Sequence, residues 1–323
     1  MQNKGRLYYI DNLKAFLIIL VVVGHCIQNF LPGYESNPLY NFIYSFHMPL
    51  FIFVSGYVSY KEHITWNSVG KRFKQLMIPF FAWAAVKTLI MRDINVFPYI
   101  MIHPDNGLWF LHTLFFVSLI MMICEAIAEK MHIRRYIVVI VVGFVLLGIR
   151  YVLGFTEYGF QSIVYYFMFY VTGFYARRTG IFCHIPSSVA IVLSLVIVAI
   201  APFYNVRGLA SFMHAGTPTI VNTAFRFLVA VIAITGIFTL FTRFAYDSNR
   251  IGSYLGTRTL GIYAIHPSLL GLYVVCFGKV SYVTSEYAKG IVCVSVICVL
   301  AITLVVYELF SKNKYISYLF LGK

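Results

Sequence analysis

The sequence predicts an all-α polytopic membrane protein with ten transmembrane helices and both termini in the cytoplasm. Of its 323 residues, 60% are hydrophobic and only 11% are charged, whereas soluble domains carry about 25% charged residues. Ten apolar segments have the length that a bilayer requires, and the loops between them alternate in basic charge. Because every loop is short, we expect one transmembrane domain over residues 1–323. The expected spans are 8–30, 39–60, 76–92, 107–128, 135–154, 160–177, 186–204, 217–242, 257–278 and 285–310.

The loop charges orient the protein. The loops on one side contain seventeen Lys and Arg residues, and the loops on the other side contain only Arg92, Arg150, Arg207 and Lys279. Basic loops stay in the cytoplasm, which places both termini there, and an even number of spans agrees with that. The same bias explains the net charge of +14, so we expect no nucleic-acid partner.

The first span carries a polar stripe made of Asp11, Lys14 and His25. At about 100° per residue, Lys14 and His25 are about 20° apart around the helix, and Asp11 is about 40° from His25. An ionisable group at the centre of a bilayer costs at least about 2.5–3.5 kcal/mol. The stripe must therefore face a protein interior or a wet cavity.

Other polar residues fall in the same outer half of the membrane as His25. They lie on four further spans: His47, His112, Arg226 and His266. A lone histidine inside a membrane is more often a packing residue, but four at matching depth on separate helices favour a site. Depth does not show that these helices are adjacent.

Clustered histidines raise the alternative of a metal site. Zinc ligands usually recur at short fixed spacing, such as two His four residues apart on a helix, and no pair here has that spacing. We therefore expect no metal. The six cysteines are expected to be small buried residues, neither disulfides nor ligands; they are Cys26, Cys124, Cys183, Cys276, Cys293 and Cys298.

Three cations gather in the inner loop after the second span, at Lys71, Arg72 and Lys74. They are consistent with a role in fixing the orientation of the protein in the membrane and in contacting anionic lipid headgroups. They also suit a phosphate site, together with Lys14 from the same inner face. The residues alone leave both interpretations open.

Several segments resemble one family. Lys14, ten residues and His25 match the Arg/Lys-x10-His signature of the membrane acyltransferase-3 family, and the opening Tyr9–Lys14 is similar to its fucose 4-O-acetylase-like branch. The basic segment departs from the usual Arg-x-x-Arg, because Gln75 stands three residues after Arg72. Further similar segments, in the right order, are His47–Tyr57, Lys71–Pro79, Leu108–Leu111 and Leu260–Pro267.

The resemblance implies acyl transfer in a bacterial inner membrane. Cytoplasmic acyl-coenzyme A, usually acetyl-CoA, would donate to a hydroxyl of an extracytoplasmic glycan or lipid-linked sugar. His25 would be the general base or a transiently acylated nucleophile, and Lys14, Lys71, Arg72 and Lys74 would bind the CoA phosphates. Other expected partners are membrane lipid, a second copy of the chain and polysaccharide-assembly proteins. Residues expected around the substrate or behind the site are Asp11, His47, Trp109, His112, Arg226, Tyr263 and His266.

Two alternatives remain open. A ten-helix exporter of small solutes or polysaccharide units would also place Lys and His along a path through the membrane, but such carriers usually show two similar halves, and this sequence shows none. A structural or export-assisting subunit of a polysaccharide machine is the other. Acyl-CoA hydrolysis or transfer by the purified protein distinguishes both from an enzyme.

Overall fold

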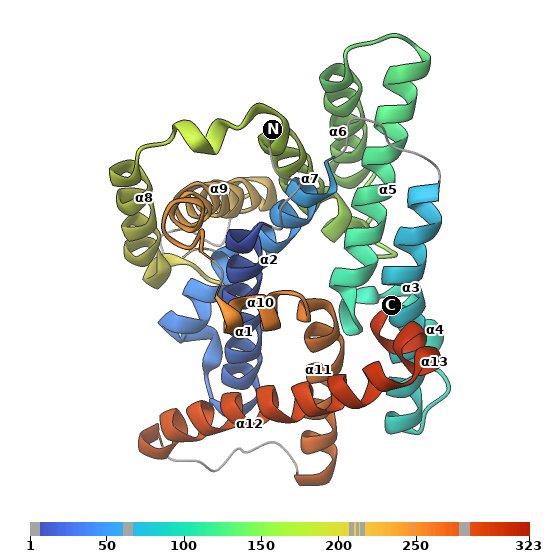
Figure 1. Ribbon diagram of the computed structural model, residues 1–323, viewed down its shortest axis with the longest axis vertical. Helices are drawn as coiled ribbons and strands as arrows, with labels where there is room; N and C mark the ends of the chain where they lie inside the picture. Colours follow the sequence, from blue (N-terminus) through green and yellow to red (C-terminus); the bar gives the residue numbers. More distant parts are fainter. Residues whose placement is uncertain are drawn as a thin grey trace. The chain divides into compact units, whose positions relative to one another are not determined.

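The computed structural model describes residues 7–60, 67–206, 210, 213, 217–247, 249–277 and 285–323, except for the side chains of 274–277 and 285–289. Every regular element within these ranges is helical (Figure 1). This confirms the all-α prediction. Arg207 and Lys279, two of the four cations expected on the outer side, lie outside the described residues.

Each of the ten expected spans coincides with a helix. Six of them, α1, α2, α3, α5, α9 and the 290–312 part of α12, are long and apolar enough to cross a membrane. The protein is therefore a multi-pass membrane protein, while ten crossings stay a prediction. The helices are α1 (Tyr8–Phe30), α2 (Pro38–Ser59), α3 (Asn67–Met91), α5 (Trp109–Lys130), α6 (Arg135–Tyr151), α7 (Phe160–Thr179), α8 (Ser187–Ile200), α9 (Thr219–Phe244), α11 (Thr259–Phe277) and α12 (Ser285–Lys312).

The outer faces of several helices are apolar. Phe144 on α6 is 70% exposed, Leu195 on α8 is 62% exposed and Ile297 on α12 is 69% exposed, and each has exposed apolar neighbours on the same helix. Soluble proteins rarely leave large continuous apolar patches in water. These faces are suited to contact with lipid.

The basic segment lies in a helix, and its assignment to a loop was wrong. Helix α3 begins at Asn67, so Lys71, Arg72 and Lys74 lie in its first two turns. Hydropathy could not detect this start because the first turns are polar, although Lys, Arg and Gln favour helix. Short elements were also missed: α4 (Val96–Ile102), α10 (Arg250–Gly256), α13 (Lys314–Ile316), the 3₁₀ turns η1 (Tyr34–Ser36), η2 (Pro104–Asn106), η3 (Ile181–His184) and η4 (Ala201–Phe203), and the π-helical turn η5 (Ser317–Leu321).

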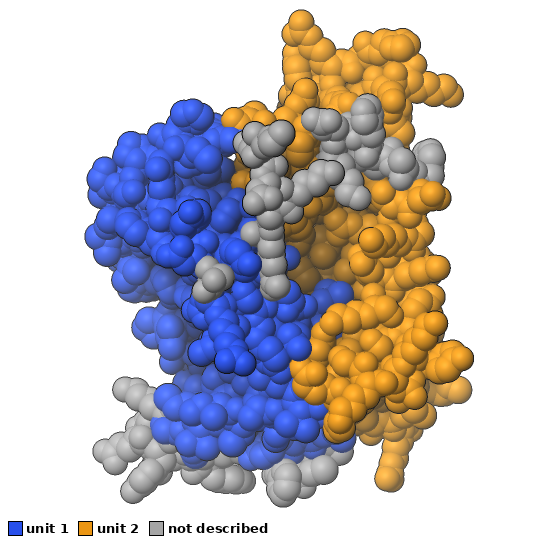
Figure 2. Space-filling model, in the orientation of Figure 1, with its two compact units in different colours: residues 1–51, 180–306 blue, residues 52–179, 307–323 orange. Residues whose placement is uncertain are grey.

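The chain forms two compact units, coloured blue and orange in Figure 2. The first comprises residues 1–51 and 180–306, and the second comprises residues 52–179 and 307–323. Helices α2 and α12 each contribute to both units.

In the first unit, α1 packs against α9, α10 and α11. Gly252 and Gly256, four residues apart on α10, face Asn12 and Asp11 so closely that a Cβ atom on either glycine would overlap α1. Small residues at this spacing let helices approach closely in membranes. The side-chain amide of Asn12 also donates to the carbonyl of Ala245 at 2.8 Å. The first turns of α1 are therefore fixed by the segment that leads into α11.

In the second unit, α5 packs against α3, α6 and α7. Gly56 of α2 and Gly173 of α7 let those two helices touch through their backbones, because a Cβ on either would overlap the carbonyl of Tyr170 or Phe53. Elements η5 and α3 also pack together, where the indole N–H of Trp83 donates to the carbonyl of Phe320 at 3.1 Å.

Candidate active site

Helix α1 carries His25 three turns beyond Lys14, about 16 Å along the axis at 1.5 Å per residue. The His25 ring is half-buried and hydrogen-bonded to the side chain of Gln28. The hydroxyl of Tyr44 donates to Oε1 of Gln28 at 3.4 Å. A Cβ on Gly24 would lie 2.7 Å from the Tyr44 ring, so the glycine makes room for this tyrosine beside His25.

Three histidines of the first unit and Tyr44 form a chain of neighbouring rings. The ring centres of His25 and His266 are 5.2 Å apart. Tyr44 lies 6.5 Å from His25 and 4.7 Å from His47, and Tyr263 lies 6.0 Å from His266. Helices α1, α2 and α11 each supply one histidine. We call His25, Tyr44, His47, Tyr263 and His266 the imidazole cluster.

Two of the three imidazoles are held by their own helices. Nδ1 of His47 lies 2.7 Å from the carbonyl oxygen of Ile43, and Nδ1 of His266 lies 2.8 Å from that of Ile262. A carbonyl only accepts hydrogen bonds, so Nδ1 carries the proton in both rings and Nε2 is an acceptor. Both side chains are buried, His266 completely.

A proline shapes the backbone beside His266. Pro267 stands inside α11 and has no N–H to donate to the carbonyl of Tyr263, four residues earlier. The His266 ring forms a hydrogen bond with the backbone there as well as with Ile262. The side chain thus satisfies part of what the proline leaves open.

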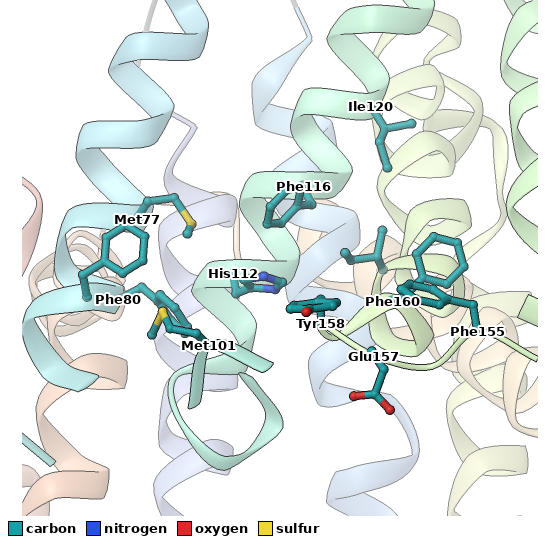
Figure 3. Close-up of a pocket in the computed structure, with 12 residues that line it drawn as sticks. Met77, Phe80, Met101, His112, Phe116, Ile120, Phe155, Glu157, Tyr158 and Phe160 are labelled. Atoms are coloured by element: carbon teal, nitrogen blue, oxygen red, sulfur yellow. The ribbon is translucent and has the colours of Figure 1, made fainter. Parts of the chain in front are cut away.

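His112 lies in the second unit, in a pocket of about 510 Å³ (Figure 3). The ring centres of Phe80 and Phe116 lie 5.5 and 4.6 Å from that of His112. The Nδ1 atom of His112 is buried without a hydrogen-bond partner among the described residues. The structure therefore does not place His112 in the imidazole cluster. The pocket is lined mostly by apolar residues: Met77, Phe80, Phe81, Met101, His112, Phe116, Ile120, Phe155, Glu157, Tyr158, Phe160 and Ile163.

The other predicted site residues have varied surroundings. Trp109 stacks on Tyr166 with ring centres 5.2 Å apart in the second unit. Arg226 donates to the carbonyls of Asn205 and Val206, both at 2.6 Å, and so joins α9 to the segment after η4. Asp11 is buried where α10 packs on α1.

The predicted donor-binding cations divide between the two units. Lys71 and Lys74 are exposed on α3, and Arg72 beside them is half-buried. Lys14 is half-buried on α1 in the first unit. Their shared role at one phosphate group therefore stays a prediction.

Comparison with known families matches residues 7–310 to the model described as "Acyltransferase domain" of the acyltransferase-3 group. The chain belongs to the acyltransferase-3 family. The match extends through both compact units and includes the Lys14–His25 signature and the Tyr263–Pro267 segment, which contribute to the imidazole cluster. The family prediction made from these motifs is thereby confirmed.

Two relatives of this acyltransferase-3 protein share shorter segments with it. Nodulation protein NolL of Sinorhizobium fredii is 40% identical over 83 residues, which are 24% of this chain and 23% of the relative. NolL of Mesorhizobium japonicum is 36% identical over 98 residues, 27% of this chain and 25% of the relative. The aligned segments thus span about a quarter of these relatives. No solved structure matches the chain.

The cysteines of the acyltransferase only partly follow expectation. Cys26 and Cys124 are buried, but Cys183, Cys293 and Cys298 are exposed, so their predicted burial was wrong. Cys293 and Cys298 lie on α12 among exposed apolar residues, because an apolar run can face lipid as well as a core. All five are free, and Cys276 lies outside the described side chains. The described residues contain no group of three or more His, Cys, Asp or Glu that could hold a metal.

Sequence reasoning missed two members of the site's surroundings, Tyr44 and Gln28. Both lie one helical turn from a predicted histidine, Tyr44 three residues before His47 and Gln28 three residues after His25. That spacing puts them on the same helix faces. It was the available signal, but it is common in any helix.

Proposed function

We propose that this acyltransferase moves an acetyl group from cytoplasmic acetyl-CoA to a hydroxyl of an extracytoplasmic or lipid-linked glycan, with His25 as general base. Family membership supports acyl transfer. One observation supports the choice of His25: it is the half-buried member of a cluster whose other two imidazoles are buried. Of the three histidines, His25 is the least buried residue.

The proposed chemistry needs one base and leaves it unchanged. An imidazole nitrogen of His25 takes the hydroxyl proton while the hydroxyl oxygen attacks the thioester carbonyl. The new C–O bond forms and the C–S bond breaks. The proton then passes from His25 to the departing CoA thiolate, which leaves as a thiol. General acid–base catalysis of this kind contributes about 10²–10⁴ in rate.

The donor side would be the basic start of α3. Lys71 and Lys74 are exposed and Arg72 is half-buried within one turn of the helix, which suits the phosphates of a CoA nucleotide. We also assign Lys14 to donor binding; it lies in the first unit, on the face of α1 that carries His25. No metal is assigned a role.

Replacing Lys14, Lys71, Arg72 or Lys74 with Ala should raise KM for acetyl-CoA and change kcat little, because the phosphates stay away from the reacting carbonyl. The difference in KM between wild type and variant should become smaller as salt rises, because salt weakens the attraction between exposed charges. The screening length is about 8 Å at physiological ionic strength. Initial rates at two ionic strengths measure both effects. Lys130→Ala, an exposed cation on α5, controls for net charge. If KM for acetyl-CoA equals the wild-type value in all four variants, these cations have a role in topology alone.

The proposed topology has ten crossings in a bacterial inner membrane with both termini inside. The loop bias of the sequence supports it, and so does the bacterial origin of the NolL relatives. A reporter that is active only outside the cytoplasm, fused after Lys323 through a flexible spacer, should stay silent. Activity of that reporter, with a cytoplasm-active reporter silent at the same position, would contradict the orientation.

The test of the function is acyl transfer by the purified protein. With labelled acetyl-CoA, label should appear on an added glycan or lipid-linked sugar, and free CoA should accumulate in step with it. The exporter alternative predicts movement of solute across proteoliposomes without CoA release. Absence of both hydrolysis and transfer, with the protein folded and acetyl-CoA bound, would contradict an enzyme.

A further inference from the structure

The imidazole cluster contains no carboxylate among the described contacts of its histidines. His25 contacts Gln28, Tyr44 and His266. A catalytic base is usually oriented by a third group that accepts a hydrogen bond from it. Some other acceptor must perform that task here.

His266 has the free acceptor. Its Nδ1 is engaged by backbone carbonyls, so Nε2 carries a lone pair. This Nε2 is buried and has no hydrogen-bond partner among the described residues, in a side chain with 0% exposure. A buried acceptor without a partner costs free energy, and in native structures a functional role is one of the reasons why such a group is kept. His47 has the same backbone bond, but its Nε2 is not a buried atom without a partner.

The distance to His25 suits a shared hydrogen bond. An N–H···N bond of about 2.9 Å between two imidazoles places their ring centres about 5 Å apart. The rings of His25 and His266 are 5.2 Å apart and inclined by 51°. The separation of the two rings therefore matches such a bond, and its formation would require a change in the orientation of the His25 ring.

We propose that His266 is a positioning residue whose Nε2 accepts a hydrogen bond from His25. The bond would turn the other nitrogen of His25 towards the glycan hydroxyl, which replaces Gln28 as the hydrogen-bond partner of His25. It would also stabilise the imidazolium formed during transfer. His266 keeps its own proton on Nδ1 throughout. The inference rests on the proposed function, since it assigns a partner to the proposed base.

Two substitutions at His266 separate acceptor from bulk. His266→Leu removes the acceptor and should lower kcat about tenfold to a hundredfold, the effect of one hydrogen bond to a charged group, with KM for acetyl-CoA unchanged. His266→Gln puts an amide oxygen near the position of Nε2 and should restore most of that loss. Thr239→Val is the matched control, because its buried hydroxyl in the same unit also has no partner, and it should behave as wild type.

A double-mutant cycle gives a readout that a structural role would not produce. If His266 acts through His25, His266→Leu should cause no further loss in a His25→Gln background. Additive losses in the double variant would overturn the proposal, as would equal kcat for His266→Leu and wild type. So would a His266→Gln variant as inactive as His266→Leu, or a His266→Leu variant that is inactive while His25→Gln remains active.

The inference and the proposed function fail in different ways. If wild type transfers acetyl groups and the cycle is additive, only the positioning role is wrong. If folded wild type that binds acetyl-CoA neither hydrolyses nor transfers it, the function itself is wrong and the positioning role goes with it. Thermal melting and acetyl-CoA binding of each variant identify loss of folding. If His266→Leu does not fold, the kcat of a His266→Gln variant with wild-type stability decides: a value near wild type supports the proposal, and an inactive variant overturns it.

Discussion

Replacing His25 with Gln is expected to lower acyl transfer at least about a hundredfold, the lower end of general acid–base catalysis. Gln keeps a hydrogen-bonding shape but cannot take a proton at neutral pH. Protein level and acetyl-CoA binding should remain near normal, because the substitution removes basicity and little volume. Initial rates with saturating acetyl-CoA and glycan measure the effect.

The other intramembrane histidines belong in the same experiment. His47→Gln and His112→Gln test the remaining ring of the imidazole cluster and the ring in the second-unit pocket, beside the His266 variants. Retained activity in His25→Gln together with complete loss in His112→Gln would mean that the base lies in that pocket. Transfer by all four substituted proteins would contradict a mechanism in which any of these four histidines is the base.

Replacing Gly256 with Ala is expected to destabilise the protein by about 3 kcal/mol or more, at or beyond the upper end of typical overpacking. The added methyl group would overlap the backbone carbonyl of Asp11, and a backbone cannot move aside as a flexible side chain can. Helices α1 and α10 must then separate at the base of the helix that carries His25. Thermal melting in detergent and residual transfer at a permissive temperature measure the two consequences.

Gly271→Ala is the matched control for this effect. It adds the same methyl group to a helix of the same unit, but among the described residues no atom outside its own stretch of helix lies within 4 Å of the new Cβ. Alanine should leave stability unchanged or raise it by up to about 1 kcal/mol through helix propensity. Equal melting of the two variants would show that the contact between α1 and α10 tolerates separation.

The long helices were predictable because a bilayer demands apolar segments of a given length with their backbone bonds satisfied internally. The same signal fails where a helix is polar or short. It missed the start of α3 at Asn67 and all of α10 (Arg250–Gly256). The glycine spacing on α10 that lets it pack against α1 was present in the sequence, but nothing indicated its partner.

The candidate site was predictable along one axis only. Counting residues predicts the depth of a side chain in the membrane, and three histidines at matching predicted depth, His25, His47 and His266, are neighbours through their rings and that of Tyr44. His112 has a matching predicted depth, yet it lies in the other compact unit. Position around the bundle depends on which helices pack together, and contacts such as those of Gly24 and Gly256 decide that.

The anchoring of His47 and His266 to their own backbones has a consequence for membrane insertion. A carboxylate that oriented His25 would bring a formal charge into the bilayer, at about 2.5–3.5 kcal/mol on insertion scales. An imidazole with its proton fixed on Nδ1 offers an acceptor of known direction without that charge. Because each ring bonds to a carbonyl of its own helix, helix formation alone aligns the two rings. Helices α2 and α11 can therefore enter the membrane with these polar groups already oriented and uncharged.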